Sequence, residues 1–353
     1  MTSLITLFLL LNIPPVSESA PNRQPQLAAS QSVVALVFGS GNSVMFAQSK
    51  DDGAAFSKPV AIAAVPILAL GRHRGPRIVF SGKTMLVSAI GSPVLAAPGE
   101  HTHGGLAEGD LLLWRSIDGG KTWSKAISIN DAPGAAREGL HAISADDKGN
   151  VAAVWLDLRV KGTRLYGAFS HDAGETWSKN VLVYESSDGT ICQCCHPTLA
   201  SLGNGEFAVM FRNFVAGNRD MYLLHIREGA VISKAEKLGV ENWALNACPM
   251  DGGGMAVENG HLLTAWRRGP DLFIAEPGKQ ESRIGSGTDV ALAVQGGRTY
   301  ALWTKAGAIE ASVTGKIEVL SDAGAFPVAV PLASGGVLAA WESNGIIQMR
   351  RLR

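Results

Sequence analysis

One pattern of apolar and polar residues recurs along the chain: a β-rich apolar run, then a turn, then a second run in which apolar and polar residues alternate. No run keeps the apolar period of a helix. The runs come in pairs typical of β-hairpins: residues 33–38 with 43–49, 84–90 with 111–116, 151–156 with 165–170, 207–211 with 221–225, 262–266 with 272–275, 300–303 with 309–313, and 337–341 with 346–350. A further short run precedes most pairs, at residues 77–80, 141–144, 197–201, 254–257, 289–294 and 327–332. The pattern therefore predicts an all-β protein of seven similar units.

Each predicted unit holds three or four antiparallel strands, which are too few to bury both faces of a sheet alone. Radial packing around an axis buries these faces and leaves only short edges, as in a β-propeller. Aromatic residues end equivalent strands in five of the units and are expected to pack between blades: Trp155, Phe211, Trp266, Trp303 and Trp341. The last unit lacks an outer strand, and we expect residues 27–32 to supply it and close the ring.

One hairpin segment is repeated. Residues 116–123 and 170–177 carry Ser, Asp, Gly and Trp at the first, third, fifth and eighth positions, and residues 49–56 form a looser copy with Phe last. The carboxylates of Asp118 and Asp172 are expected to accept hydrogen bonds from turn amides, while the glycine supplies a positive φ. The segment resembles the Asp-box (BNR) repeat of sialidases and related β-propellers. Sialidases have six blades, so six or seven are predicted here; a β-sandwich, the alternative fold, would not explain the repeat.

Composition limits the function classes. The 353 residues include 31 Lys and Arg and 31 Asp and Glu, giving a formal net charge of zero. This balance lacks the basic footprint of a nucleic-acid-binding protein. Because repeat units bury themselves against their neighbours, residues 32–353 are predicted to form a single propeller domain despite their number.

The amino terminus has the features of an export signal. Residues 4–13 are apolar, Pro14 and Pro15 end the run, and the small residues Ser17 and Ser19 follow. Residues 1–19 are therefore predicted to be a signal peptide and residues 20–31 a polar linker, with the mature protein secreted or periplasmic and without a membrane span. The alternative is a frayed hydrophobic terminus.

Residues that precede the predicted innermost strands should meet at one end of the propeller axis. They include a dense group of thiols and an imidazole, Cys192, Cys194, Cys195 and His196, followed in the next unit by Cys248. With His141, these residues are candidate ligands for a soft metal, copper or zinc. Structural disulfides are the alternative for an exported protein, and inert thiols a third reading. His101 and His103, in a Gly- and Pro-rich loop, are weaker candidate ligands.

The order of these segments resembles a set of secreted bacterial sialidase-like proteins. Their Cys-x-Cys-Cys segment corresponds to residues 192–195, their Phe-Arg-Asn and Arg-Asp segments to residues 211–213 and 219–220, and their Ala-Cys-Pro segment to residues 247–249. The sequence departs from them at residues 249–252, where Pro-Met-Asp-Gly replaces Pro-Val-Asn-Gly. The resemblance covers nearly the whole mature chain and implies the propeller architecture.

The resemblance also implies an exo-sialidase-type glycoside hydrolase that acts on sialic acid or a related acidic sugar. Arg77, Arg212 and Arg219 are the candidate carboxylate-binding residues. Asp157 and Asp220 are the candidate acids. A sialidase also needs a tyrosine nucleophile beside a glutamate, yet all four tyrosines fall in strand-like runs. The alternative function is therefore a non-catalytic propeller whose axial Cys/His cluster binds a metal or forms disulfides.

Overall fold

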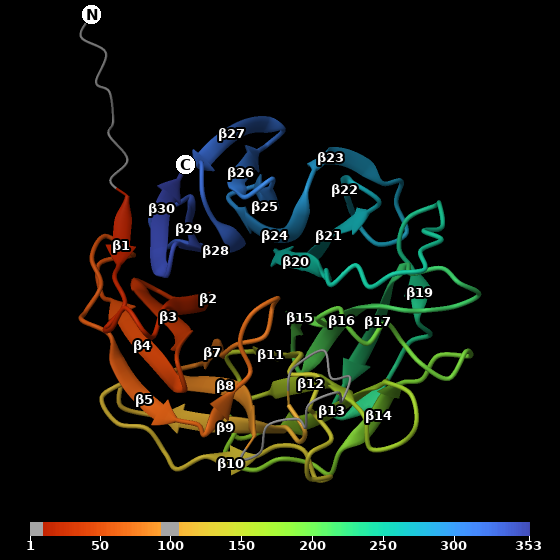
Figure 1. Cartoon of the computed structure of the whole chain (residues 1–353), viewed down its shortest axis with the longest axis horizontal. Helices are drawn as coiled ribbons and strands as arrows, with labels where there is room; N and C mark the ends of the chain where they lie inside the picture. Colours follow the sequence, from red (N-terminus) through yellow and green to blue (C-terminus); the bar gives the residue numbers. More distant parts are fainter. Residues whose placement is uncertain (1–9, 93–105) are drawn as a thin grey trace, which may run out of the picture.

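A computed structural model describes residues 10–92 and 106–353. Within these ranges there is no helix, and the strands form seven antiparallel sheets arranged as blades around an axis (Figure 1). The innermost strands are β2 (Asn22–Ser30), β7 (Arg77–Ser81), β11 (His141–Ala145), β15 (Thr198–Gly203), β20 (Gly253–Glu258), β24 (Thr288–Gln295) and β28 (Ala325–Pro331). Each innermost strand contacts those of the adjacent blades, which completes a seven-bladed propeller.

Outside each innermost strand the blade continues as a meander. The second strands are β3 (Val33–Ser40), β8 (Thr84–Ser92), β12 (Val151–Asp157), β16 (Glu206–Arg212), β21 (His261–Arg268), β25 (Arg298–Lys305) and β29 (Val337–Ser343). The third strands are β4 (Ser43–Ser49), β9 (Asp110–Ser116), β13 (Arg164–Ser170), β17 (Met221–Arg227), β22 (Asp271–Ala275), β26 (Ala308–Val313) and β30 (Ile346–Leu352). The outer strands are β5 (Val60–Ala64), β10 (Ile127–Ser128), β14 (Val181–Tyr184), β18 (Ala230–Val231) with β19 (Glu236–Lys237), β23 (Ser282–Ser286) and β27 (Lys316–Ser321). Strand β6 (Ile67–Leu68) joins β8 in the second blade.

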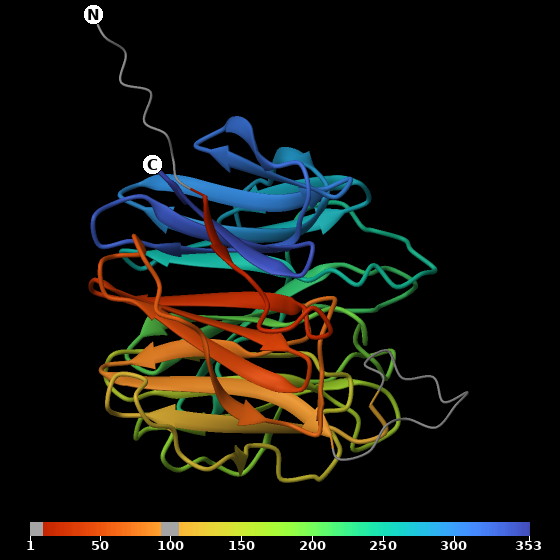
Figure 2. The ribbon, with the colours of Figure 1, turned by 60° about the vertical axis from the view of Figure 1, so that its left-hand side comes forward.

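The ring is closed by β1 (Leu11–Ile13), which supplies the outer strand of the last blade. It pairs antiparallel with β30, placing Leu11 opposite Met349, and Figure 2 shows it beside the last blade. The prediction that the last blade lacks its own outer strand is confirmed, but the assignment of residues 27–32 to that place is wrong. The side chain of Ile13 is buried in one apolar cluster with Ile347 and Met349 of β30. This burial explains why β1 occupies the outer position of the last blade. The predicted cleavage near Ser19 would remove β1, and the signal peptide stays a prediction.

The predicted linker at residues 20–31 is wrong, because β2 spans most of it and forms the innermost strand of the first blade. The polar composition misled the sequence interpretation. An innermost strand is held by backbone hydrogen bonds to β3 and turns one row of side chains toward the axis, so it does not need an alternating apolar pattern.

The core lies between blades rather than at the axis. Trp155 of the third blade shares a buried cluster with Leu86 and Ile90 of the second. Trp303 packs in the same way with the fifth blade, and Trp341 with the sixth. All three indoles are fully buried, which confirms that these aromatic residues pack between blades.

The repeated hairpins occupy equivalent places in the first three blades, where each joins a third strand to an outer strand: β4 to β5, β9 to β10, and β13 to β14. In the second blade, Oγ of Ser116 accepts a hydrogen bond from the amide of Gly120 at 2.9 Å, and Oδ1 of Asp118 accepts one from Thr122 at 3.0 Å. The same bonds recur at Ser49 and Asp51 and at Ser170 and Asp172. The geometric prediction made for the repeat is confirmed.

The glycine of each hairpin also sets the distance to the preceding blade. Gly120 has φ +82, and a Cβ there would lie 2.6 Å from the ring of Phe46 on β4. At the matching position in the third blade, a Cβ on Gly174 would lie 2.8 Å from Leu86 on β8. The repeat therefore fastens blades side by side, far from the axial residues.

No helix among the described residues is long and apolar enough to cross a membrane. The candidate ligands His101 and His103 lie outside the described residues, as does most of the apolar amino-terminal run.

Candidate functional site at the axial mouth

Irregular backbone marks one end of the axis. The innermost strands of the first, sixth and seventh blades each shift register near their start, and a non-glycine residue there adopts positive φ: Gln24 (55°), Asp289 (61°) and Phe326 (54°). His73, in the loop before β7, also has positive φ, at 67°. Bulges of this kind re-aim side chains, and strained non-glycine residues gather at functional sites. We therefore centre the candidate site on this mouth.

An imidazole and two carboxylates meet at the mouth. Nε2 of His73 lies 2.8 Å from Oδ1 of Asp289, and one oxygen of Asp251 lies within 4.8 Å of both groups. The ring of His196 stacks on His73 with centroids 4.0 Å apart, and the ring of Phe326 meets His73 edge-on at 5.0 Å. Because Asp289 engages Nε2, proton transfer by His73 would use Nδ1.

The pKa values of the two carboxyl groups are shifted in opposite directions. Burial, together with the charge of Asp289, raises the pKa of Asp251 to about 6. Burial would also raise the pKa of Asp289, but the hydrogen bond and charge of His73 outweigh it and hold that pKa below its usual value. At neutral pH the site therefore holds an ionised Asp289 next to His73. Asp251 is 1% exposed and lies behind them, with a guanidinium nitrogen of Arg267 at 3.7 Å.

Arg77 brings a charge without a counterion. Its guanidinium donates to the carbonyls of Gly75, Pro76 and His73, and among the described residues no carboxylate lies within ion-pair distance of it. Burial lowers its pKa to about 10, so it stays charged at neutral pH. Like Arg212 it is bound by carbonyls, but Arg77 lines the cavity at the axial mouth whereas Arg212 and Arg219 do not, so its charge is placed to attract an anionic group of a ligand there.

These side chains line one cavity. It has a volume of about 210 Å³ and runs into the axis between innermost strands of different blades. His73, Arg77, His196 and Asp289 lie on its wall with small and apolar residues of β2, β11, β15, β20, β24 and β28. A wall on which polar and apolar groups are mixed, with a few convergent charged groups, suits a site that orients a small ligand group.

A larger cleft, of about 1060 Å³, lies at the other end of the innermost strands of the first three blades. Its wall includes Lys50, Lys83 and Lys121 and the hairpin around Asp118. No histidine lines it; its carboxylates are Asp147 and Asp118, and Asp118 is held by the hairpin amides, so this cleft lacks the imidazole–carboxylate pair of the axial mouth.

The predicted carboxylate-binding residues Arg212 and Arg219 are committed to other contacts. Arg212 is 1% exposed and donates to the carbonyls of Asp251, Arg219 and Arg267 at 3.0, 2.7 and 3.1 Å. Arg219 donates to the carbonyl of Leu245 at 3.1 Å and to the sulfur of Cys192 at 3.2 Å. Both residues brace the loops around the mouth. Their role in substrate binding stays a prediction that these contacts do not support.

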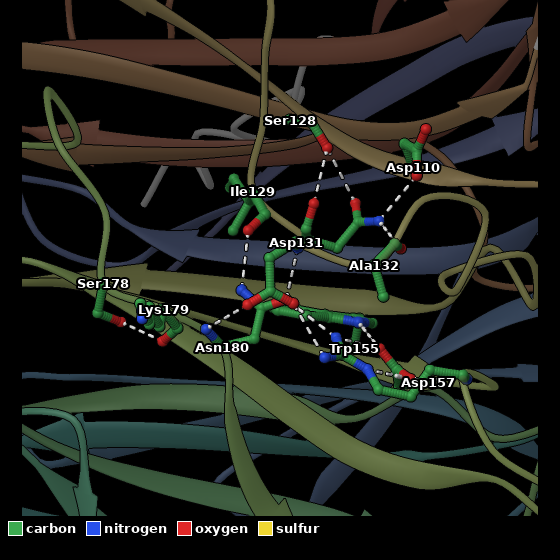
Figure 3. Close-up of polar contacts among 12 residues, drawn as sticks. Asp110, Ser128, Ile129, Asp131, Ala132, Trp155, Asp157, Ser178, Lys179 and Asn180 are labelled. Atoms are coloured by element: carbon green, nitrogen blue, oxygen red, sulfur yellow. Dashed lines mark hydrogen bonds and ion pairs between the residues drawn. The ribbon is translucent and has the colours of Figure 1, made fainter.

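The candidate acid Asp157 is buried in an ion-pair network (Figure 3). Its oxygens accept hydrogen bonds from Nε1 of Trp155 at 2.8 Å and from Nε and Nη2 of Arg159, each at 2.9 Å. Arg159 also reaches Asp131 and Asn180 at 2.9 Å, tying the third blade to the second. Asp157 does not line the axial cavity, and its contacts give it a structural role.

The second candidate acid, Asp220, is also outside the cavity. It is 8% exposed, and Oδ1 accepts a hydrogen bond from the amide of Trp243 at 2.7 Å. This bond holds residues 240–245 against the start of β17. A catalytic role for Asp220 stays a prediction without support from its position.

Three of the predicted metal ligands do meet. Sγ of Cys192 lies 3.6 Å from that of Cys194 and 3.3 Å from that of Cys195, and the remaining pair is 3.9 Å apart. Hydrogen bonds from the other two thiols, and then the charges of Arg212 and Arg219, lower the pKa of Cys192. No disulfide joins these cysteines in the structure.

The other predicted ligands lie outside this thiol group. His141 is buried on β11, with Nε2 2.9 Å from Oγ of Ser88. His196 follows the thiols in sequence but turns its ring onto His73. Cys248 is exposed and is not within 4.8 Å of all three sulfurs. The structure therefore divides the predicted Cys/His cluster into a thiol group and an imidazole–carboxylate site.

No tyrosine lines the axial cavity. Tyr300 is 1% exposed in β25, Tyr184 accepts a hydrogen bond from Asn213, and Tyr166 lies beneath Arg159. Tyr222 lies on β17. The expectation that no tyrosine is placed as a sialidase nucleophile agrees with these positions.

Sequence reasoning named Arg77 but did not select His73, Asp251 or Asp289 as site residues. A signal was present: Asp289 begins an innermost strand, and His73 lies between Arg72 and Arg74 in a loop that feeds another. Treating every titratable residue before an innermost strand alike would have included both. Asp251 carries the same signal, because it lies two residues before β20, but only the folded structure shows that it is buried.

The raised pKa of Asp251 leads to a pH prediction. A carboxyl group whose pKa is higher in the folded state than in the unfolded state is harder to ionise in the folded protein. The contribution of this group to the unfolding free energy is therefore highest below the unfolded pKa and falls as pH rises through the folded pKa. From the usual 3.8 to about 6, the difference corresponds to about 3 kcal/mol. Relative to Asp251→Asn, the wild-type unfolding free energy should therefore fall by about 2–3 kcal/mol between about pH 4 and pH 7. Urea unfolding followed by tryptophan fluorescence measures it, and a pH-independent difference between the two proteins would contradict it.

Comparisons with known proteins support the fold. No protein-family model matches the chain, and no curated protein matches its sequence. Many solved structures are similar, and three illustrate the match at low identity. A Hadza microbial sialidase aligns with a TM-score of 0.53 and 15% identity over 94% of this chain, which spans only 66% of that protein. An α-L-arabinanase of Penicillium chrysogenum, complexed with arabinobiose, aligns with a TM-score of 0.58 and 13% identity over 97% of both chains. An ulvan lyase of a polysaccharide lyase family, also solved bound to a GlcA–Rha3S saccharide, aligns with a TM-score of 0.57 and 11% identity over 97% of this chain and 94% of its own. The chain thus has the sialidase-like propeller fold predicted for it.

Proposed function

We propose that this protein processes an acidic glycan at the axial mouth, where Arg77 binds the sugar carboxylate and His73 transfers a proton. The observation that carries the proposal is that Arg77, a cation without a carboxylate partner among the described residues, shares a cavity wall with the His73–Asp289 pair. The fold supports it, because similar structures include a sialidase, an arabinanase and an ulvan lyase.

The residues favour elimination over hydrolysis. Hydrolysis by the sialidase route needs a tyrosine nucleophile, and the paired-carboxylate route needs two accessible carboxyl groups about 5–9.5 Å apart. Here one carboxylate is buried behind the other, and their oxygens lie within 4.8 Å. A histidine oriented by an aspartate, next to an arginine, instead suits removal of the proton beside a sugar carboxylate.

In this reaction Arg77 neutralises the carboxylate of a uronate residue, which acidifies the adjacent C–H bond. Nδ1 of His73 takes the proton, and the electron pair of the broken C–H bond forms a carbon–carbon double bond. The neighbouring C–O bond to the leaving sugar breaks, and its oxygen gains a proton from water. Asp289 stabilises the imidazolium that forms. The cavity, at about 210 Å³, is below the usual range of about 300–1,000 Å³, which favours action on a terminal sugar.

The experiment compares two substrate classes with the purified protein. We expect uronate-containing oligosaccharides to give an unsaturated product, detected by its ultraviolet absorbance, and a fluorogenic sialoside to give little or no turnover. Robust sialoside hydrolysis that is lost in both Arg212→Ala and Tyr300→Phe would instead support the exo-sialidase function. Absence of both activities, with no binding of acidic saccharides in calorimetry, would refute the proposal.

We further propose export to the cell exterior or periplasm, where such glycans are met, on the basis of the apolar run and small residues before Ala20. Sequencing the amino terminus of the exported protein tests it. An intact terminus that retains Leu11–Ile13 would contradict cleavage near Ser19 and keep β1 in place.

The alternative, a non-catalytic propeller that binds a metal, is favoured by the convergence of three sulfurs within 3.9 Å. Those sulfurs do not belong to the imidazole–carboxylate group, so metal binding and glycan processing are compatible in one chain.

A further inference from the structure

Three thiols form a compact, buried group in the loop between β14 and β15. Cys192, Cys194 and Cys195 are each 1% exposed, and their sulfurs are 3.3, 3.6 and 3.9 Å apart. A metal ion bound at about 2.3 Å to each of three sulfurs in one plane would hold them about 4 Å apart. The observed triangle is close to that size before any ion is bound.

We propose that Cys192, Cys194 and Cys195 bind one copper(I) ion through three sulfur ligands.

The ligand set favours copper(I): no imidazole or carboxylate of the described residues joins the three thiols, and the side chain packed against them, Met250, has a soft thioether sulfur. The three thiol sulfurs all lie within 4.8 Å of one another. Structural zinc is almost always four-coordinate, whereas soft sulfur ligands select copper(I), which accepts three. The burial of the group leaves little access for a water molecule to complete a zinc site.

The surrounding charge suits this complex. Three thiolates around a monovalent ion carry two net negative charges, which would be costly to bury without compensation. Arg219 donates to the sulfur of Cys192 at 3.2 Å, and Arg212 and Arg74 lie close enough to interact electrostatically with Cys192 and Cys194. The arginines that sequence reasoning assigned to a sugar carboxylate therefore balance the charge of the thiol site.

The backbone holds the sulfurs in place. The amide of Cys192 donates to the carbonyl of Arg212 at 3.1 Å, and the amide of Ile191 donates to the carbonyl of Thr163 at 3.0 Å. Met250 packs against the three cysteines from the adjacent loop and is contacted by Arg72. A bound ion would also fix Cys195 and hence the following residue, His196, whose ring stacks on His73 at the axial mouth.

The test loads reduced, anaerobically purified protein with copper(I) held by a competing chelator and measures metal per chain by mass spectrometry. We expect one copper per chain, with X-ray absorption showing sulfur neighbours at about 2.3 Å. Cys194→Ser should lose stoichiometric copper, whereas the matched control Cys248→Ser, which changes an exposed cysteine outside the group, should retain it. Circular dichroism of both apo variants checks that they fold.

Several outcomes would overturn the proposal. They are retention of one copper in Cys194→Ser, equal loss in Cys248→Ser, tighter binding of zinc than of copper, and a Cys192–Cys195 disulfide in the anaerobic protein. A rise in the unfolding temperature on adding copper(I), absent in Cys194→Ser, would support it independently of metal counting. Because none of these readouts uses a glycan, failure of the proposed glycan activity leaves this test intact.

Discussion

Replacing His73 with glutamine is expected to lower the rate of glycan elimination by about 10²–10⁴-fold, the contribution typical of a positioned general base. Glutamine keeps a polar group near Asp289 but cannot take up the proton that the reaction removes. The loss should fall mainly on kcat, because Arg77 still binds the carboxylate. Initial rates on the uronate substrate identified for the wild-type protein measure the effect.

The matched control for this variant is His261→Gln, which changes an exposed histidine on β21 far from the axial cavity. It should leave both kcat and KM unchanged. Asp289→Asn should slow the reaction through the orientation of His73, since an amide no longer stabilises the imidazolium. Wild-type rates in folded His73→Gln would exclude His73 as the base.

Replacing Asp157 with alanine is expected to destabilise the fold by about 3–5 kcal/mol, the cost of breaking a buried pair from one side. The change leaves Nε1 of Trp155 and the guanidinium of Arg159 without their buried acceptor. The unfolding free energy from urea titration measures this loss. The size of the effect depends on burial, because Asp157 is fully buried whereas the side chain of Asp131 in the same network is 48% exposed.

Asp131→Ala is therefore the control, and it should cost no more than about 1 kcal/mol, as exposed ion pairs do. The pair of variants separates the structural role of Asp157 from the catalytic role predicted from sequence. If Asp157→Ala retained wild-type stability but lost glycan activity, the catalytic prediction would be correct and the structural interpretation wrong.

Most strands were predictable because they are local. The second strands are short, nearly continuous apolar runs, and tight turns join them to the third strands, so neighbouring residues carry the signal. The two strands that were misassigned, β1 and β2, gain their place from distant partners. Strand β1 pairs with β30, more than three hundred residues later, and β2 contacts β28 of the last blade. No local pattern encodes such pairings.

Some residues of the candidate site were likewise predictable from local sequence, and others were not. The thiols of Cys192, Cys194 and Cys195 were predictable as a group because they lie within four consecutive residues. Arg212, by contrast, had the sequence context of a ligand-binding arginine. In the folded protein it donates to the carbonyls of Arg219, Asp251 and Arg267, which lie 7, 39 and 55 positions further along the chain. Which charges remain available for a ligand is decided by loops that meet only in the folded ring.

The sequence by itself determined the all-β class, the seven repeating units, the hairpin repeat and the proximity of three thiols, because each depends on spacing within one unit. The tertiary structure alone decided how the ring closes, which arginine lines the axial cavity and how His73, Asp251 and Asp289 meet. The physical reason is that closure depends on a pairing between the two ends of the chain, and that the meeting of His73 with Asp289 involves positive φ angles in segments of different blades. Small backbone irregularities of this kind are stabilised by contacts between blades, which the order of residues along one blade does not contain.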